Sequence, residues 1–278
     1  MTGFDSGFLE LPQTLTVPQP TEAAGRAPLR DLDYTHFTVL LDPRRRLAVA
    51  TAVNIDGSAL RELGRGDDWH LDERIPSSEQ AGPELYARND LDRGHLVRRR
   101  DPVWGDATVA QRANVDSFCY TNAAPQAAVF NQSLELWNGL EDLVLEYATV
   151  NRARLSVFTG PVFSDADRLY RGVRIPQQFW KVAAWSSDGR LTASGYLLDQ
   201  TAQLDDIDLE AARATTETED LPPLGPFRAF QLPIVDIAAL TALDFGALPA
   251  ADVLEPVPAV RPDVTAWIEL AGPADLHF

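Results

Sequence analysis

Cysteine, lysine and long apolar runs are scarce in this sequence. Cys119 is the only cysteine among the 278 residues, so an intramolecular disulfide and a zinc site built on cysteines are both excluded. Lys181 is the only lysine, so arginine carries almost all of the positive charge. No segment approaches the ~20 apolar residues that a membrane-spanning helix needs. Residues 1–30 also lack the basic start and apolar run of a secretion signal, so we expect a cytoplasmic location and no membrane partner.

The formal net charge of −17 opposes a nucleic-acid partner, because proteins that bind polyanions usually carry a basic face. The acidity is unevenly distributed, however. Residues 84–112 hold six arginines against five acids, whereas residues 205–220 hold seven acids and one arginine. We interpret residues 205–220 as a solvated segment away from any binding cleft. The alternative is an autoinhibitory or partner-binding element that mimics nucleic acid.

The first half of the chain contains several predicted elements. Four prolines within residues 1–30 predict an irregular N-terminal arm. Apolar, β-prone runs predict two strands, at residues 37–41 and 47–53, joined by a turn at residues 42–44. Residues 117–121 are typical of a short strand before a proline-containing loop. Apolar residues at helical spacing predict a helix over residues 132–150.

The second half adds a buried strand at residues 154–159, ended by Gly160-Pro161, and a hairpin formed by residues 179–185 and 191–198. Lys181 falls in this hairpin, where we expect its stem to follow apolar surface and its ammonium group to reach water. Strands mixed irregularly with few helices favour an α+β fold over a βαβ repeat. No linker divides the chain, so residues 31–278 are expected to form one domain.

The tetrapeptide Asp92-Arg93-Gly94-His95 brings together side chains that suit phosphodiester hydrolysis. A histidine can accept a proton from water near pH 7. An adjacent arginine can hold a phosphate, and glycine lets the backbone approach closely. Arg98-Arg99-Arg100 follows and adds positive charge beside the motif. A histidine in such a short motif can equally be structural or simply exposed.

A second motif, Thr121-Asn122 followed by Pro125-Gln126, precedes Asn131-Gln132 at the start of the predicted helix. An asparagine side-chain oxygen is a neutral, hard ligand that suits Mg²⁺, which keeps most of its water ligands. An asparagine at the start of a helix is also a common N-cap. For Asn131, both roles remain open from the residue type and position alone.

Taken in order, these motifs resemble the DNA/RNA non-specific endonucleases, a family of ββα-metal nucleases. The resemblance includes Asp92-Arg93-Gly94-His95, Thr121-Asn122, Pro125-Gln126, Asn131-Gln132 and the Leu140-Glu141 pair of the predicted helix, and weaker echoes extend it from about Asp33 to Leu248. It implies a central, mostly antiparallel sheet flanked by helices, with the metal-site helix directly after Asn131-Gln132. It also implies cleavage of DNA or RNA to 5′-phosphate ends with little base specificity.

The resemblance implies a role for each motif residue. His95 corresponds to the general base, Arg93 to its neighbouring arginine, Asn122 to a residue that supports the site, and Asn131 to the ligand of one Mg²⁺ ion. Mn²⁺ is expected to substitute for Mg²⁺. Glu141 corresponds to a glutamate that positions metal-bound water, but it lies ten residues after Asn131, two more than in the family. Glu135 is therefore kept as a rival for this role.

The family also uses an upstream arginine to bind phosphate. Arg65 and Arg74, which flank Trp69, are both candidates, and Arg98 is a further candidate for substrate contact. A homodimer and an inhibitor protein are compatible with this interpretation. One alternative is a weak or inactive family member that acts as a protein- or nucleic-acid-binding module. Another is a phosphodiesterase restricted to small or lipid substrates.

Overall fold

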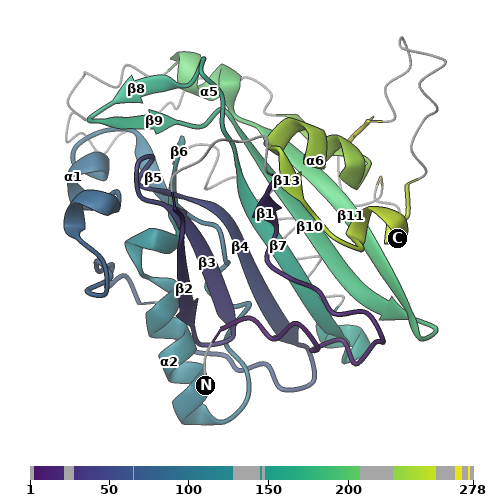
Figure 1. Cartoon of the computed structure of the whole chain (residues 1–278). Coiled ribbons are helices and arrows are strands. Elements are labelled where there is room, and N and C mark those ends of the chain that lie inside the picture. The colour runs from purple at the N-terminus through teal and green to yellow at the C-terminus, as the bar shows by residue number, and fades with distance from the viewer. Residues whose placement is uncertain are drawn as a thin grey trace, which may run out of the picture.

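The central feature of the fold is an eight-stranded sheet in the order β14-β12-β11-β10-β7-β4-β3-β2, and each pairing within it is antiparallel (Figure 1). The computed structural model describes residues 3–21, 28–64, 66–127, 145, 148–206, 228–254, 267–270 and 275. The sheet strands are β2 (Arg30–Tyr34), β3 (Phe37–Asp42), β4 (Leu47–Asp56), β7 (Arg154–Val162), β10 (Gln178–Ser187), β11 (Arg190–Asp199), β12 (Arg228–Gln231) and β14 (Ile268–Glu269). The predicted α+β class is confirmed.

Both faces of this sheet carry an apolar core. Along β10 the side chains alternate, as the pleat of a strand requires: Phe179 and Ala183 join one core, and Trp180 and Val182 join the other. We call the side of Phe179 and Ala183 the site face, and the side of Trp180 and Val182 the arm face. The two faces carry different parts of the chain.

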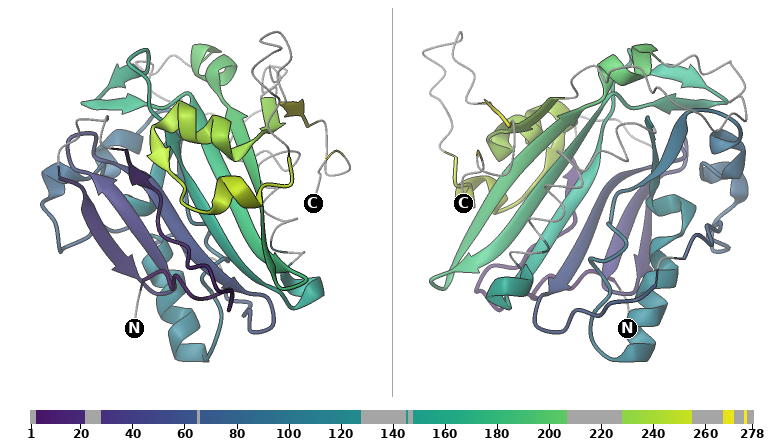
Figure 2. Two further views of the ribbon diagram at one scale, coloured as in Figure 1. Left: turned by 45° about the vertical axis from the view of Figure 1, so that its right-hand side comes forward. Right: turned by 180° about the vertical axis from the view of Figure 1, so that it is seen from behind.

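The arm face is covered by the N-terminal arm and by helix α6 (Ile234–Thr241) (Figure 2). Phe8 and Leu15 of the arm share one core cluster with Ile237 of α6. The described part of the arm is mainly irregular, but it packs tightly against the sheet. Its short strand β1 (Gln19–Pro20) pairs with β13 (Leu243–Asp244) near the other end of the sequence.

The site face carries helix α1 (Pro83–Tyr86) and a separate two-stranded ribbon, β5 (Leu91–His95) with β6 (Ala123–Ala127). Leu85 of α1 and Ala124 of β6 pack into the site-face core. The remaining elements are η2 (Ser77–Glu79), α2 (Ala107–Ser117), η3 (Tyr120–Asn122), β8 (Arg168–Tyr170), β9 (Val173–Ile175), α5 (Thr201–Asp206) and η4 (Leu248–Ala251).

The two hairpins predicted from apolar patterning are confirmed. The first predicted pair of strands corresponds to β3 and β4, which pair antiparallel, and the second corresponds to β10 and β11. Asp188 and Gly189 join β10 to β11 with φ values of 50° and 73°. Positive φ at both central residues is the conformation that tight hairpins favour, and aspartate followed by glycine tolerates it.

One predicted strand boundary and one predicted strand are wrong. Strand β7 does not end at Gly160-Pro161 but continues to Val162, because Gly160 and Pro161 pair with Trp180 and Phe179 of β10. Gly160 is required there because a Cβ atom would come within 2.5 Å of the Val49 carbonyl oxygen and 2.9 Å of the Trp180 ring. The expected strand at 117–121 is instead the end of α2 and the turn η3, and the expected proline loop is strand β6.

Helix α2 was not predicted from the sequence. It begins after Asp106, whose Oδ1 accepts hydrogen bonds of 2.9 Å from the backbone N–H groups of Thr108 and Val109. This is the usual arrangement of an aspartate N-cap. The helix has a weak apolar stripe, with Ala110 and Ala113 among its buried residues, so periodicity gave little signal.

Lys181 is buried, with 1% of its surface exposed, so the expected contact of its ammonium group with water is wrong. In the sheet register it lies between Thr159 of β7 and Tyr196 of β11, which are also buried. Burial raises the pKa of Tyr196 to about 12. The only lysine of the chain therefore belongs to a polar row inside the site-face core.

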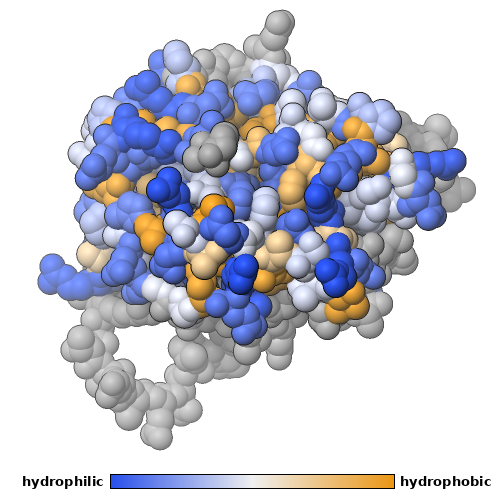
Figure 3. All heavy atoms as spheres, turned by 90° about the horizontal axis from the view of Figure 1, so that it is seen from below, coloured by the Kyte–Doolittle hydropathy of each residue, from blue (hydrophilic) through white to orange (hydrophobic). Residues whose placement is uncertain are grey.

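The surface shows scattered apolar residues rather than one continuous patch on the side seen from below (Figure 3). Single exposed apolar residues are normal on globular proteins. No helix in the described ranges is long and apolar enough to cross a membrane. Most of the helix predicted over residues 132–150, and most of the acidic segment 205–220, lie outside the described residues.

Candidate active site

The β5–β6 ribbon presents Arg93 and His95 together. In the antiparallel register, Arg93 lies opposite Pro125 and His95 lies opposite Ala123. Alternation along a strand puts Arg93 and His95 on one face of the ribbon and Asp92 on the other. His95 and Arg93 are both partly exposed, although the Nε2 atom of His95 is buried. A guanidinium and an imidazole therefore lie side by side on this face of the ribbon.

Gly94 lies between them because the opposite face of the ribbon is filled by Gln126. A Cβ atom at Gly94 would overlap the Cδ atom of that side chain. Gln126 itself is fully buried. The sequence suggested that this glycine lets the backbone approach a ligand. The structure gives a different reason: the glycine makes room for the Gln126 side chain of the neighbouring strand β6.

Asn122 anchors the chain just beyond His95. Its Oδ1 accepts a hydrogen bond of 2.8 Å from the N–H of Val97, and its Nδ2 donates to the carbonyl oxygens of Val97 at 2.9 Å and Ser117 at 3.0 Å. The N–H of Leu96 also donates to the Asn122 carbonyl oxygen. Asn122 is fully buried and both of its Nδ2 hydrogens are used in these bonds, so its side chain holds the ribbon in place.

The imidazole of His95 is flanked by aromatic rings. The Trp69 ring centroid lies 4.6 Å from that of His95, and Phe118 approaches from another side at 5.2 Å with its ring plane at 80°. Trp69 also contacts the guanidinium of Arg93, whose Cζ lies 5.5 Å from the indole centroid. An ion pair of 3.6 Å links Arg93 to Asp67. One short segment, residues 67–69, thus contacts both predicted functional side chains.

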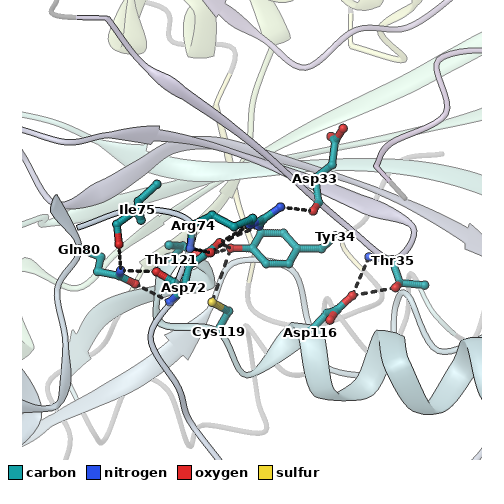
Figure 4. A network of polar contacts seen from close by, with 10 residues as sticks. All are labelled: Asp33, Tyr34, Thr35, Asp72, Arg74, Ile75, Gln80, Asp116, Cys119 and Thr121. Carbon is teal, nitrogen blue, oxygen red and sulfur yellow. Dashed lines mark hydrogen bonds and ion pairs between the residues drawn. The ribbon is translucent and has the colours of Figure 1, made fainter. Parts of the chain in front are cut away.

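A network of polar contacts involves Asp72, three residues after Trp69 in the chain (Figure 4). The hydroxyl of Tyr34 donates to Asp72 and lies 2.6 Å from the Thr121 hydroxyl oxygen. Burial, followed by the charges and hydrogen bonds of Cys119 and Asp72, raises the pKa of Tyr34. This network ties the chain after Trp69 to the turn that contains Asn122.

Arg74 is part of the same network rather than of the ribbon. It donates to both carboxylate oxygens of Asp72 and, at 2.8 Å, to the carbonyl oxygen of Asp33 (Figure 4). Burial opposes ionisation of Asp72, but hydrogen bonds from Arg74 and Tyr34 outweigh it and lower the pKa of Asp72. Arg74 lines an open groove of about 1000 Å³, and neither Arg93 nor His95 lines it. A phosphate-binding role for Arg74 remains a prediction.

The three arginines that follow His95 have different surroundings. Arg99 donates to the Leu63 carbonyl oxygen and to Asn114, and Arg100 lies 3.8 Å from Glu62. Arg98 is half-buried. Arg99 therefore holds the loop at residues 61–64, and Arg100 makes an exposed contact with it. Four other predicted site residues lie outside the described residues: Arg65, Asn131, Glu135 and Glu141.

The described residues contain no group of three or more histidine, cysteine, aspartate or glutamate side chains that could hold a metal ion. A metal centre built from several carboxylates is therefore not found within the described ranges. This finding is compatible with a Mg²⁺ ion that takes one amide ligand and keeps its waters, as predicted for Asn131. The predicted ligand itself is not among the residues that the structure describes.

Sequence reasoning missed the contribution of Trp69, Phe118 and Gln126. In the sequence Trp69 stands out only as a neighbour of two arginines, and its contact with His95 joins residues that are far apart in the chain. Gln126 belongs to a recognised motif, but its packing against Gly94 depends on the ribbon register. Phe118 precedes the motif and gives no signal of its own.

A sequence profile of the DNA/RNA non-specific endonuclease family matches residues 21–252. The uncharacterised protein y4fB of Sinorhizobium fredii (strain NBRC 101917 / NGR234) is 43% identical over 229 residues, covering 77% of this chain and 33% of that protein. Mitochondrial endonuclease G of Bos taurus is 28% identical over 189 residues, covering 63% of this chain and 60% of the relative. The Homo sapiens protein is 29% identical over 169 residues, covering 55% and 54%.

The chain therefore spans between a third and three fifths of the length of these curated relatives. The crystal structure of an EndoG/EndoGI complex contains a similar chain, with a TM-score of 0.58 at 18% identity, covering 79% of this chain and 86% of that one. This likeness confirms the predicted ββα-metal nuclease fold. Because the family profile covers well over half of the sequence, the protein belongs to the DNA/RNA non-specific endonuclease family.

Proposed function

We propose that the chain is a divalent-metal-dependent endonuclease that hydrolyses phosphodiester bonds of DNA, RNA or both. The observation that carries this proposal is the pairing of Arg93 and His95 on one face of the β5–β6 ribbon. A phosphodiester needs both a cationic group at its non-bridging oxygens and a base for the attacking water. Family membership and the fold support the same reaction.

In this proposal His95 accepts the proton of a water molecule as that water attacks phosphorus. Arg93 holds the phosphate through charge-assisted hydrogen bonds, which orient it in line with the attacking water. Asn122 keeps the ribbon end in place through its contacts with Val97 and Ser117. Departure of the 3′-oxygen leaves a 5′-phosphate. These groups would contact phosphate rather than base edges, so little base specificity is expected.

The proposed metal is one Mg²⁺ ion, with Mn²⁺ as a substitute, held by the side chain of Asn131. A bound Mg²⁺ would neutralise charge on the phosphate and provide a water ligand acidic enough to protonate the leaving 3′-oxygen. We propose Glu141 to orient that water, with Glu135 as the rival. Arg65, Arg74 and Arg98 are the proposed further contacts for the substrate backbone.

Control by a protein inhibitor is a second part of the proposal. The crystal structure of the EndoG/EndoGI complex concerns the inhibition of EndoG, a nuclease whose fold this chain shares. The net charge of −17 adds a reason to expect a protein partner, since a nuclease this acidic repels nucleic acid at long range. Size-exclusion chromatography of the complex captured from its host would separate an inhibitor from a second copy of the chain. Recovery of free monomer alone would contradict both.

The test of the reaction is cleavage of supercoiled plasmid and of a single-stranded RNA in Mg²⁺. We expect cleavage by the wild type, loss of cleavage with EDTA, recovery with Mn²⁺, and a loss of at least about 100-fold in His95→Ala, in line with removal of a general base. His70→Ala is the matched control, because His70 is exposed and lines the groove of Arg74 rather than the ribbon.

A folded wild-type protein that binds nucleic acid but cleaves neither substrate with either metal would contradict the proposal. That result would favour the alternative of an inactive binding module. Cleavage of a small chromogenic phosphodiester but not of plasmid or RNA would favour a restricted phosphodiesterase. Full activity in His95→Ala would show that the base lies elsewhere.

A further inference from the structure

Trp69 is the residue that contacts both proposed functional side chains of the ribbon. Its indole lies 4.6 Å from the His95 ring, with 50° between the ring planes, and the Arg93 guanidinium carbon lies 5.5 Å from its centroid. Arg93 and His95 are two positions apart on one strand and project to the same side. A single flat ring therefore contacts both of them.

The indole is itself held firmly in place. Phe118 meets it edge to face at 5.4 Å, and Tyr120 lies 5.7 Å away. The backbone on its C-terminal side is fixed as well, because His70 donates its N–H to the Phe118 carbonyl oxygen and accepts a hydrogen bond from the N–H of Tyr120. Trp69 is half-buried. Its indole packs against Phe118 and Tyr120 and also contacts the ribbon residues.

The polar network of Figure 4 strengthens this attachment. Asp72, three residues after Trp69, accepts from the hydroxyl of Tyr34, which also contacts Thr121. Asn122, which anchors the ribbon, is the next residue after Thr121. The contacts that hold the indole and those that hold the ribbon thus both involve the turn η3. A rigid connection of this kind can fix the position of Trp69 relative to His95.

Contact with Trp69 restricts the rotamers of both ribbon side chains, in addition to the Arg93–Asp67 ion pair and the Phe118 contact of His95. An arginine has many accessible rotamers, and ordering it at the moment of binding costs affinity. A guanidinium over an indole is attracted to the ring face and loses part of that freedom in advance. An imidazole in contact with both Trp69 and Phe118 has fewer ring orientations. Such preorganisation matters because small misplacements of reacting groups slow a reaction strongly.

We propose that Trp69 is a positioning residue that sets Arg93 and His95 in fixed register for the phosphate and the attacking water. This inference rests on the proposed function, since it assigns Trp69 a role toward its base and its phosphate-binding arginine. It adds a residue 26 positions upstream of His95 in the sequence, outside the recognised motifs. Trp69 acts through its neighbours and needs no contact with the substrate.

The test compares Trp69→Phe, Trp69→Leu and Trp69→Ala in steady-state cleavage of a defined oligonucleotide with Mg²⁺. We expect Trp69→Ala to lower kcat by about 10- to 100-fold, as for a misplaced reacting group, and to raise KM because Arg93 loses its support. Trp69→Phe keeps an aromatic face and should recover most of both. Trp69→Leu keeps apolar packing without a π face, so it should fold but recover little.

The matched control is Trp267→Ala. Trp267 is also half-buried, but it hydrogen-bonds to Asp236 and packs against Phe230, so it belongs to the arm-face core. Its loss should leave kcat and KM unchanged. If Trp69→Ala does not fold, the leucine and phenylalanine variants still separate packing from aromatic contact. Wild-type kinetics in a folded Trp69→Leu protein would overturn the proposal.

A second readout does not depend on cleavage. The imidazole signals of His95 in NMR spectra, assigned by their loss in His95→Ala, should form one sharp set in the wild type and in Trp69→Phe. Loss of the aromatic ring in Trp69→Leu removes its ring current and shifts these signals whatever its role, so the diagnostic change is broadening or doubling. Signals in Trp69→Leu as sharp and single as in the wild type would overturn the positioning role even for an inactive protein. Broadened or doubled signals in a protein that cleaves nothing would instead mean that only the proposed function has failed.

Discussion

Asn122 and Val97 are joined by two hydrogen bonds that run in opposite directions. The N–H of Val97 donates to Oδ1 at 2.8 Å, and Nδ2 donates back to the Val97 carbonyl oxygen at 2.9 Å. The amide side chain thereby acts as one more strand partner for the chain just after His95. Only a group with a donor and an acceptor side by side can do this, and an asparagine supplies both.

Asn122→Asp should therefore destabilise the protein although the two side chains have the same shape. The second carboxylate oxygen would face the carbonyl oxygens of Val97 and Ser117 without a proton to donate. We expect a loss of about 2–3 kcal/mol in the free energy of unfolding at pH 7, the cost of unmet buried polar groups. Urea titration followed by circular dichroism measures it. Gln111→Glu makes the same change of charge at an exposed position and should leave the midpoint almost unchanged.

Asp67→Asn should strengthen substrate binding. The Asp67 carboxylate lies 3.6 Å from Arg93, where it competes with a phosphate for the guanidinium. Exposed ion pairs of this kind are worth about 0.2–1 kcal/mol, so KM should fall by up to about 5-fold at low salt. The effect should shrink as added salt screens the pair. Asp68→Asn removes the same charge one residue further along and should change KM less. Equal effects of the two variants would contradict a specific Asp67–Arg93 contact.

Gly94→Ala should lower stability through a clash with Gln126. A Cβ atom at position 94 would overlap the Gln126 side chain, and overpacking of this kind costs about 1–3 kcal/mol. Adding Gln126→Ala should restore part of the loss, which makes the pair a double-mutant cycle. Thermal unfolding of the two single variants and the double variant measures the coupling. Strictly additive losses would show that the glycine is needed for another reason.

His36→Asn should reduce the dependence of stability on pH. His36 stacks on Trp104 with 3.5 Å between ring centroids, and burial lowers the pKa of His36 below 6.5. The folded state therefore favours the neutral imidazole, and its contribution to stability is lost as the pH falls below 6.5 through the lowered pKa. Asparagine tolerates the φ of 68° at this position.

The measurement for this prediction is the Tm of wild type and His36→Asn at pH values from about 7.5 down to about 5, a range that covers histidine titration. The wild-type Tm should fall more steeply. His70→Asn replaces an exposed histidine and should keep the wild-type slope. Parallel curves for wild type and His36→Asn would contradict a pH-sensitive contribution from His36.

The parts of the fold that were predictable are those in which neighbours in sequence determine the outcome. Strands β3, β4, β10 and β11 follow from apolar runs and tight turns, which are local signals. Arg93 and His95 were predicted as site residues, but the strand that puts both on one face of the β5–β6 ribbon was not predicted. Their roles came from resemblance to the family rather than from geometry.

The parts that were missed depend on contacts between distant segments. The packing of Trp69 against His95 requires residues 69–71 to lie beside residues 118–120. The continuation of β7 through Gly160-Pro161 depends on its pairing with β10, which overrides the usual turn preference of these residues. Arg74 illustrates the same limit, because its partner Asp72 is near in sequence but its place in the groove is set by the fold.

The pairing of the N-terminal arm with β13 also constrains the order in which the protein can fold. Thr21 donates its backbone N–H to the carbonyl oxygen of Ala242, 221 residues later in the chain. The first arm residues can dock early, because Phe4 and Asp5 hydrogen-bond to Thr38 of β3 and Asn54 of β4. During synthesis the β1 end of the arm must instead wait until β13 has emerged from the ribosome. Until then the arm face, including Trp180 and Val182, is available to chaperones or to other chains. The pairing of β1 with β13 therefore covers this part of the sheet only at a late stage of synthesis.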